Sequence, residues 1–284
     1  MVNTELKLPL ERIDVLPAMP IIVQKLLTLP LDTKEGEVQL LKLIEQDPQI
    51  SAKIIGLSNS ALFGIPRKIA SVGDAAMCLG LTRVKSVAIG IATMSTLKKP
   101  VEGKLKASDL WLHSMAIAIA MRSIAKYIPS HIRPMDEQIF LAGLLHDIGF
   151  NALSFLDVTL CDKLLDQLST PNDTPILELE QELMGTHHSE IGARLATHWG
   201  LPDEIVEVIR YHHTPNAAQA GVEHPLIHLV HITEKIIPDV GISEHTQQEI
   251  TQQEWRAIGV NSNMQDTIIE EAIAAVEQAR AIKI

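Results

Sequence analysis

The sequence is poor in aromatic residues, which make up 3% of its 284 residues, although hydrophobic residues make up 46%. A core must therefore be built mainly from Leu, Ile, Val, Ala and Met. Because β-strands draw heavily on aromatic and β-branched side chains, this composition favours helices over strands. We predict an all-α protein with roughly 13–15 helices.

Cysteine is also scarce, and targeting signals are missing. The two cysteines, Cys78 and Cys161, lie far apart in apolar surroundings, which indicates reduced, buried thiols and no disulfide framework. The N-terminus has no basic segment followed by an apolar one, as a secretory signal would have. The longest apolar run, Val87 to Met94, is far shorter than the roughly 18–20 residues of a membrane span. We therefore expect a cytoplasmic protein.

Positive charge is under-represented. The chain has 24 Lys and Arg against 35 Asp and Glu, which gives a formal net charge of −11. Such a chain repels phosphate backbones and anionic lipids, so we expect neither nucleic acid nor a membrane as partner. A DNA contact through residues 82–85 is an alternative that the same charge disfavours. The sequence also lacks a G-x-S-x-G motif, a glycine-rich phosphate loop and a cysteine cluster.

Helix start signals recur along the chain. Asp47 before Pro48 is typical of a helix start, and Ser71, Thr82 and Ser108 are further candidate N-caps. One long helix is expected at about residues 136–155. The charged, Pro- and Gly-containing segment 98–103 predicts a linker. We therefore expect an N-terminal helical subdomain at residues 1–100, a second at 108–240 and C-terminal helices at 245–284.

Histidines and acidic residues gather in the second of these parts. Asp109 and His113 are four residues apart, so they share one face of a predicted helix. His146 and Asp147 follow an apolar run, where a buried carboxylate is costly unless it has a partner such as a divalent cation. Further histidines beside apolar helices include His188, His212 and His213. Imidazole with carboxylate is a ligand set that suits Zn, Fe or Mn better than Ca.

An interpretation without a metal is open for each of these residues. Isolated histidines are ordinarily surface or satisfied core residues, and this applies to His131, His198, His224 and His228. His231 lies three residues before Glu234 on one helix face, as a solvated pair or as support for a nearby ligand. Adjacent histidines also arise by chance in a chain with twelve of them. The spacing alone thus leaves both interpretations open.

The order of the motifs resembles a known family. The segments LWLHS, LAGLLHDIG, HHSEIGARLATHWGLP and VIRYHH resemble the HD superfamily of metal-dependent phosphohydrolases. The N-terminal segments LPAMPIIVQKLLTL, LIEQDPQISAKIIGLSNSALFG and SVGDAAMCLGL resemble its HDOD branch of bacterial signalling proteins. This resemblance implies an N-terminal helical bundle packed against an HD-type helical bundle with a metal centre.

The resemblance also implies a ligand set. His146 and Asp147 match the signature pair, with Asp147 as the bridging and catalytically central carboxylate if two metals bind. The other positions that match metal ligands of the superfamily are Asp109, His113, His188, His212, His213 and Glu234. The implied cofactor is a divalent metal, with two ions of Fe, Mn or Zn.

Two positions depart from the enzymatic pattern. Glu234 stands where the HD pattern has its final aspartate, and its extra methylene changes the metal geometry. Phe150 stands where cyclic-dinucleotide phosphodiesterases of the HD-GYP branch have a lysine that contacts substrate phosphate. After His213 the chain reads Thr-Pro-Asn-Ala, without a G-Y-P loop. Hydrolysis of cyclic di-GMP is therefore not expected.

Two functions remain. The first is a regulatory signal-transduction module that binds a signalling protein or a small phosphorylated ligand, with a structural or vestigial metal. The second is an active metal-dependent phosphohydrolase or phosphodiesterase, in which two metals polarise a phosphate group. The C-terminal apolar stripe packs within the chain by default, and a homodimer through these helices is the alternative.

Overall fold

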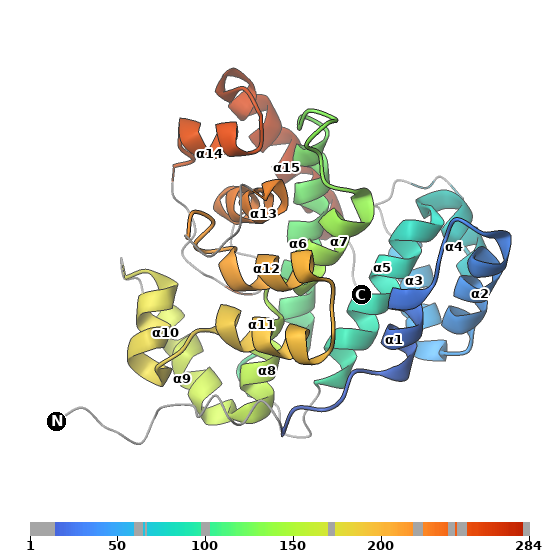
Figure 1. Ribbon diagram of the computed structural model, residues 1–284, viewed down its shortest axis with the longest axis horizontal. Helices are drawn as coiled ribbons and strands as arrows, with labels where there is room; N and C mark the ends of the chain where they lie inside the picture. Colours follow the sequence, from blue (N-terminus) through green and yellow to red (C-terminus); the bar gives the residue numbers. More distant parts are fainter. Residues whose placement is uncertain are drawn as a thin grey trace.

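The protein is all helical (Figure 1). The computed structural model describes residues 15–59, 65, 67–97, 103–169, 174–217, 224–237, 242 and 249–280. Helices α1 to α15 run through these ranges, and no extended strand occurs in them. This confirms the predicted fold class. The predicted linker at 98–103 lies outside the described residues except for Gly103.

The N-terminal helices form a small bundle of their own. They are α1 (Ile21–Thr28), α2 (Lys34–Glu45), α3 (Pro48–Ser58), α4 (Val72–Leu79) and α5 (Leu81–Thr96). Two predicted caps are confirmed, because Asp47 accepts from the first backbone N–H groups of α3 and Ser71 accepts from one in α4. The predicted cap at Thr82 is wrong. Gly80, with a φ of 90° that glycine tolerates best, ends α4 and directly precedes α5.

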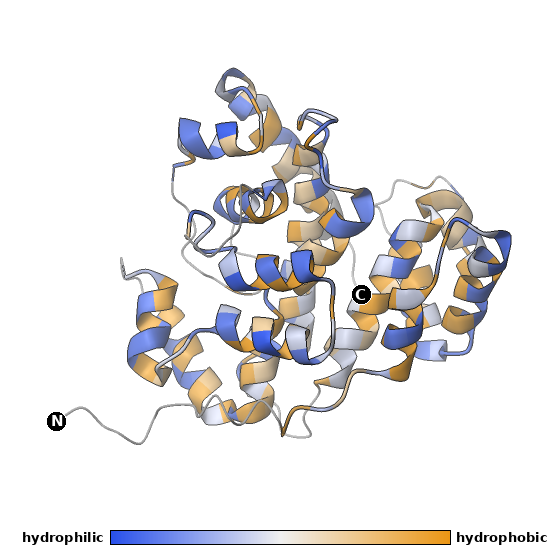
Figure 2. Cartoon of the chain, in the orientation of Figure 1, coloured by the Kyte–Doolittle hydropathy of each residue, from blue (hydrophilic) through white to orange (hydrophobic). Residues whose placement is uncertain are grey.

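The second part of the chain is built around α6. Its helices are α6 (Ala107–Ala125), α7 (Asp136–Leu145), α8 (Ile148–Leu156), α9 (Val158–Leu168), α10 (Ile176–Met184), α11 (His188–His198), α12 (Asp203–Tyr211) and α13 (Pro225–Ile236). Helix α6 is apolar and buried along most of its length because α7, α13 and α15 all pack against it (Figure 2). It begins at Ala107, so the predicted cap at Ser108 lies inside the helix instead.

The helix predicted at residues 136–155 is interrupted, and the prediction of one continuous helix is wrong. Asp147 leaves helical geometry, with φ −100° and ψ 17°, and separates α7 from α8. The span Asp136–Leu156 is the one described stretch that is long and apolar enough to cross a membrane, but 83% of it is buried inside the protein. Such burial is typical of helices in the core of a folded domain.

The C-terminal segment packs on the rest of the chain. It contains α14 (Gln252–Ala257), a 3-10 turn (Ser262–Met264) and α15 (Gln265–Arg280). Helix α15 lies along α6 and buries Ile268, Ala272 and Val276. Tyr127 donates a hydrogen bond to Glu271 at 2.8 Å across this contact. The default expectation for the C-terminal apolar stripe is thus confirmed, whereas homodimer formation stays a prediction.

The expectations for the two cysteines and for the subdomain boundaries have different outcomes. Cys161 is buried as predicted, but Cys78 is exposed, because it lies on the outer face of α4 next to Arg67. The predicted subdomain boundaries stay a prediction. Helix α5 of the first subdomain packs directly against α7 of the second, and a Cβ added at Gly90 would lie 2.7 Å from Leu144 Cδ1.

Candidate metal centre

Seven of the eight predicted ligand residues come together in two adjacent groups. The first group contains His113, His146 and Glu234, and the second contains Asp147, His188, His212 and His213. Within each group the nitrogen and oxygen atoms lie within 4.8 Å of one another. The structure thus assembles the residues that the sequence analysis selected from positions more than a hundred residues apart.

Helix ends deliver most of these side chains. His146 ends α7, Asp147 precedes α8, His188 begins α11 and His212 ends α12. These four residues are 0% exposed. His113 comes from the interior of α6, and Glu234 comes from the last turn of α13. The interruption between α7 and α8 therefore has a reason, since it turns Asp147 into the interior between the other helices.

Small residues allow the helices to approach closely at this point. A Cβ added at Gly149 would lie 1.9 Å from the carbonyl oxygen of His188, a distance that no real Cβ reaches. Gly192 lies on the other side of the same contact, where an added Cβ would lie 3.0 Å from the Gly149 nitrogen. The backbones of α8 and α11 thus touch, which brings Asp147 next to His188.

In the first group, three atoms face the Nε2 atom of His146. This atom lies 3.3 Å from His113 Nε2, 3.3 Å from Asp147 Oδ2 and 3.1 Å from Glu234 Oε1. The distance from His113 Nε2 to Asp147 Oδ2 is also 3.3 Å. Two imidazole nitrogens and two carboxylate oxygens therefore converge on one point.

In the second group, the centre is His188 Nε2. It lies 3.3 Å from His212 Nε2, 3.2 Å from His213 Nε2 and 3.5 Å from Asp147 Oδ1. His212 Nε2 is also 3.5 Å from Asp147 Oδ1. His213 is half-buried, whereas the other members are fully enclosed.

Asp147 belongs to both groups. Its Oδ2 faces His113 and His146, and its Oδ1 faces His188 and His212. Neither oxygen accepts a hydrogen bond from any described residue, although both are buried. A buried carboxylate in that state is costly unless a cation compensates it.

The imidazole rings are oriented as metal ligands are. His146 Nδ1 donates to the carbonyl of Gly143 at 2.9 Å, and His212 Nδ1 donates to that of Ile209 at 2.9 Å. In a neutral ring the Nε2 atom then carries a lone pair, and these lone pairs point at one another. Ligands about 2.1 Å from one ion, at angles of roughly 90–109°, lie about 3.0–3.4 Å apart, as most of these atoms do. The donor set therefore fits divalent cations, and mixed imidazole and carboxylate ligands favour Zn, Fe or Mn.

The charged groups of the site shift one another's pKa values. Burial lowers the pKa of His146, but the nearby negative charges of Asp147 and Glu234 raise that pKa well above its usual range. Burial raises the pKa of Asp147, yet His146, His113 and His188 bring it well below its usual range. Burial and the neighbouring His212 lower the pKa of His213.

Glu180 on α10 supports the second group, and the sequence analysis missed it. It is 0% exposed, and its carboxylate lies 2.8 Å from His188 Nδ1. A carboxylate on the outer nitrogen of a metal-binding histidine fixes the ring and raises its basicity. A signal was present, because Glu180 lies one helical turn from both Ile176 and Met184, on the buried face of α10.

Two other flagged residues lie at the edge of this arrangement. Phe150 is 0% exposed and stacks on His188, with ring centroids 4.3 Å apart and an interplanar angle of 13°. Asp109 lies outside both groups, half-buried on α6 with its Oδ1 3.3 Å from Ser108 Oγ. Its role as a ligand stays a prediction.

Comparison with known sequences identifies relatives. Residues 16–215 match the profile of the HDOD domain family. A protein from Treponema pallidum (strain Nichols), named only as uncharacterized, is 27% identical over 224 residues, which cover 78% of this chain and 42% of that protein. The chain thus spans less than half the length of this relative.

Solved structures share the fold. An HDOD domain protein of unknown function from Geobacter sulfurreducens is 26% identical, with a TM-score of 0.73 over 92% of both chains. A protein from Marinobacter aquaeolei VT8, provisionally named for signal transduction, is 23% identical, with a TM-score of 0.76 over 98% of this chain and 61% of its own. A provisionally named phosphohydrolase from Shewanella amazonensis SB2B is 21% identical, with a TM-score of 0.71 over 96% of this chain and 97% of its own. The latter two similarities concern the fold alone.

Proposed function

The chain belongs to the HDOD family, and we propose that it is a signal-transduction protein whose HD-type centre binds two divalent metal ions. The observation that carries this proposal is the placement of Asp147. Its two oxygens face two separate sets of ligand atoms, and neither oxygen has a hydrogen-bond donor among the described residues.

Each set of side chains would hold one ion. His113, His146 and Glu234 would hold the first, whereas His188, His212 and His213 would hold the second. Asp147 would contribute one oxygen to each. Divalent ions bound there supply Lewis-acid polarisation of phosphate oxygens. Glu180 holds the His188 ring in the orientation that presents Nε2.

The surroundings of the centre favour regulation over catalysis. Phe150 packs on His188 at the position where the resembling phosphodiesterases carry a phosphate-binding lysine. Six of the seven assembled side chains are buried. A metal centre enclosed in this way stabilises the arrangement of α6, α7, α11, α12 and α13, so that metal loading changes the stability of the whole bundle.

A metal-dependent phosphohydrolase is the second candidate. The observation that favours it is that one carboxylate faces both ligand groups, an arrangement in which two bound ions would lie close enough to clamp one phosphate group. The assay is hydrolysis of phosphomonoesters, nucleotides and cyclic dinucleotides with Fe²⁺, Mn²⁺ or Zn²⁺ supplied. The regulatory proposal predicts no turnover, and robust hydrolysis that disappears in Asp147→Ala would overturn it.

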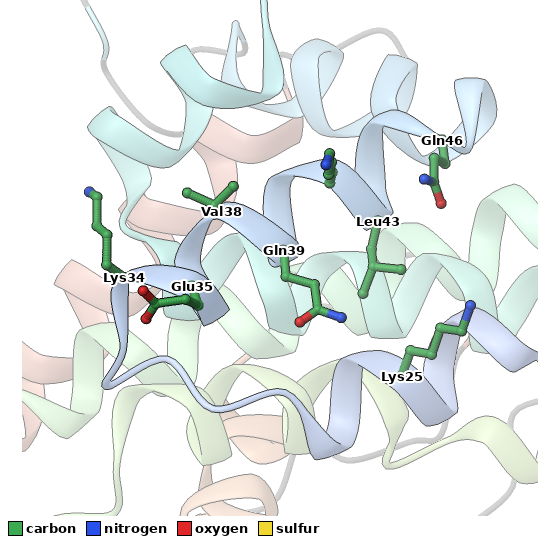
Figure 3. Close-up of a pocket in the computed structure, with 8 residues that line it drawn as sticks. Lys25, Lys34, Glu35, Val38, Gln39, Leu43 and Gln46 are labelled. Atoms are coloured by element: carbon green, nitrogen blue, oxygen red, sulfur yellow. The ribbon is translucent and has the colours of Figure 1, made fainter.

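A regulatory role needs a partner surface, and a groove between α1 and α2 suits an acidic signalling protein (Figure 3). The cavity has a volume of about 580 Å³ and lies in the N-terminal bundle. Its lining residues are Lys25, Lys34, Glu35, Val38, Gln39, Lys42, Leu43 and Gln46. Three lysines and one glutamate line it; Lys34 pairs with Glu37 at 3.1 Å, and Lys25 and Lys42 add positive charge in a chain of net charge −11. Because its lysines come from both α1 and α2, the groove matches an extended acidic surface, and this complementarity supports an acidic protein as the partner.

The partner proposal is testable once the partner is identified. Exchanging Lys25 and Lys42 for Glu is expected to abolish binding and leave the metal content unchanged, whereas unaltered binding would exclude this groove.

We also propose that the protein is cytoplasmic, because an exposed free thiol such as Cys78 suits a reducing compartment.

A further inference from the structure

A chain of contacts runs from the metal centre to the C-terminal helices through His231. On α13, His231 lies three residues before Glu234, so it occupies the next turn of the same helix. Its Nδ1 donates to the backbone carbonyl of His212 at 2.8 Å. His231 thus holds the backbone of one metal-group residue and shares a helix with another.

The other nitrogen of His231 faces α14. Its Nε2 lies 3.1 Å from Oε1 of Glu254, and the same oxygen accepts from Lys235 Nζ at 2.5 Å. The second oxygen of Glu254 accepts from the backbone N–H of Thr251 at 2.6 Å, in the capping box that starts α14. The carboxylate is therefore fixed on both sides.

The electrostatics of Glu254 agree with a fixed, ionised carboxylate. Burial raises its pKa, but the hydrogen bonds from Lys235 and Thr251 offset that effect and lower the pKa to about 2. Beside it, Trp255 is 0% exposed and anchors α14 in the core. Helix α14 lies beyond residues 16–215, the part that matches the HDOD profile.

We propose that Glu254 is a positioning residue through which α14 tunes the metal affinity of the centre. This inference rests on the proposed metal binding. Displacing α14 would release His231 from Glu254 and remove a fixed donor from the His212 carbonyl. His212 and His213 would then lose their preset positions in the second group. Because coupling between sites is reciprocal, metal loading stabilises the docking of α14 by the same factor.

The test compares two matched variants of the 284-residue chain with Mn²⁺ as the probe. Glu254→Gln removes the charge that faces His231 and Lys235, and Glu270→Gln changes an exposed residue of α15 as a control. We expect Glu254→Gln to bind Mn²⁺ about 10-fold more weakly, and Glu270→Gln to match the wild type. Hydrogen exchange should show that Mn²⁺ protects residues 252–257 in the wild type and does so less in Glu254→Gln.

The outcomes separate the two proposals. A wild type that binds no Mn²⁺, Fe²⁺ or Zn²⁺ would overturn the metal centre, and the coupling with it. Mn²⁺ binding with equal affinity in Glu254→Gln and no metal-dependent protection of α14 would overturn the coupling alone. If Glu254→Gln does not fold, the exchange experiment on the wild type still decides: the coupling predicts that Mn²⁺ protects residues 252–257 more than residues 34–45 of α2, whereas equal protection of both segments, as from stabilisation of the whole bundle, would overturn it.

Discussion

Glu180 contacts His188 at two points. One carboxylate oxygen lies 2.8 Å from the ring Nδ1, and the other accepts the backbone N–H of His188 at 3.1 Å. The ring can then rotate little, and its Nε2 is directed at the second group of ligand atoms. A buried acid outside the ligand set thus determines how that set is presented.

Replacing this acid tests its role. Glu180→Gln keeps the shape of the side chain but removes the charge that makes the His188 ring more basic. We expect metal affinity to fall by about 10- to 100-fold with the fold retained, as titration against a competing chelator would measure. Glu178→Gln, at an exposed position of the same helix, is the control. Equal affinity in both variants would show that Glu180 does not support the centre.

The close contact between α8 and α11 leads to a prediction for Gly149→Ala. Gly149→Ala places a Cβ against the His188 carbonyl and must push the two helices apart. We expect a loss of about 1–3 kcal/mol in unfolding free energy, together with weaker metal binding. The control is Gly56→Ala, because an added Cβ there meets nothing within 4 Å and should be neutral or stabilising. Denaturant unfolding and metal titration of both variants check this; unchanged metal affinity in Gly149→Ala would contradict it.

Phe150 allows a test of the departure from the phosphodiesterase pattern. Phe150→Lys puts a charge at a 0% exposed position on the His188 ring, so we expect lower stability and no hydrolysis of cyclic dinucleotides. Phe150→Leu is the control and should retain most of the stability, because it keeps an apolar side chain there. Thermal unfolding and a phosphodiesterase assay measure both effects. A stable, active Phe150→Lys protein would show that the site lacks only a lysine.

The ion pair at Glu254 predicts a pH dependence. Its pKa is lowered to about 2, so its contribution to stability is complete above its usual value of 4.5 and is lost as the pH falls toward 2. The difference in unfolding free energy between the metal-free wild type and Glu254→Gln should therefore shrink as the pH falls from about 4.5 toward 2. Urea unfolding at several pH values measures this difference. A difference that grows on acidification would contradict the account.

Local signals predicted much of the fold. Asp47 and Ser71 correctly predicted where α3 and α4 begin, because each side chain accepts backbone N–H groups of the first turn. The gap between α7 and α8 was not predictable from periodicity, since the apolar pattern runs on across it. Only the packing of other helices shows that the Asp147 carboxylate must turn inward.

The site was predictable to a similar degree. Matching the histidines and acidic residues to the HD pattern predicted eight ligands, and the structure brings seven of them together. Glu180 was not selected, and for His231 a supporting role was one of two open interpretations, because these roles depend on which histidine each residue meets across the bundle. Asp109 was selected because it lies one helical turn before His113, but this spacing does not bring it into either group.

The measurement that tests the central claim most directly is the metal content of the 284-residue chain, purified without added metal and again after reconstitution with Fe²⁺, Mn²⁺ or Zn²⁺. Elemental analysis should find about two divalent ions per chain in the wild type and in Asp203→Asn, which changes an exposed acid at the start of α12. Asp147→Asn should lose most of this metal, because one carboxylate faces both groups. A wild-type protein that holds no metal even after reconstitution would contradict the account.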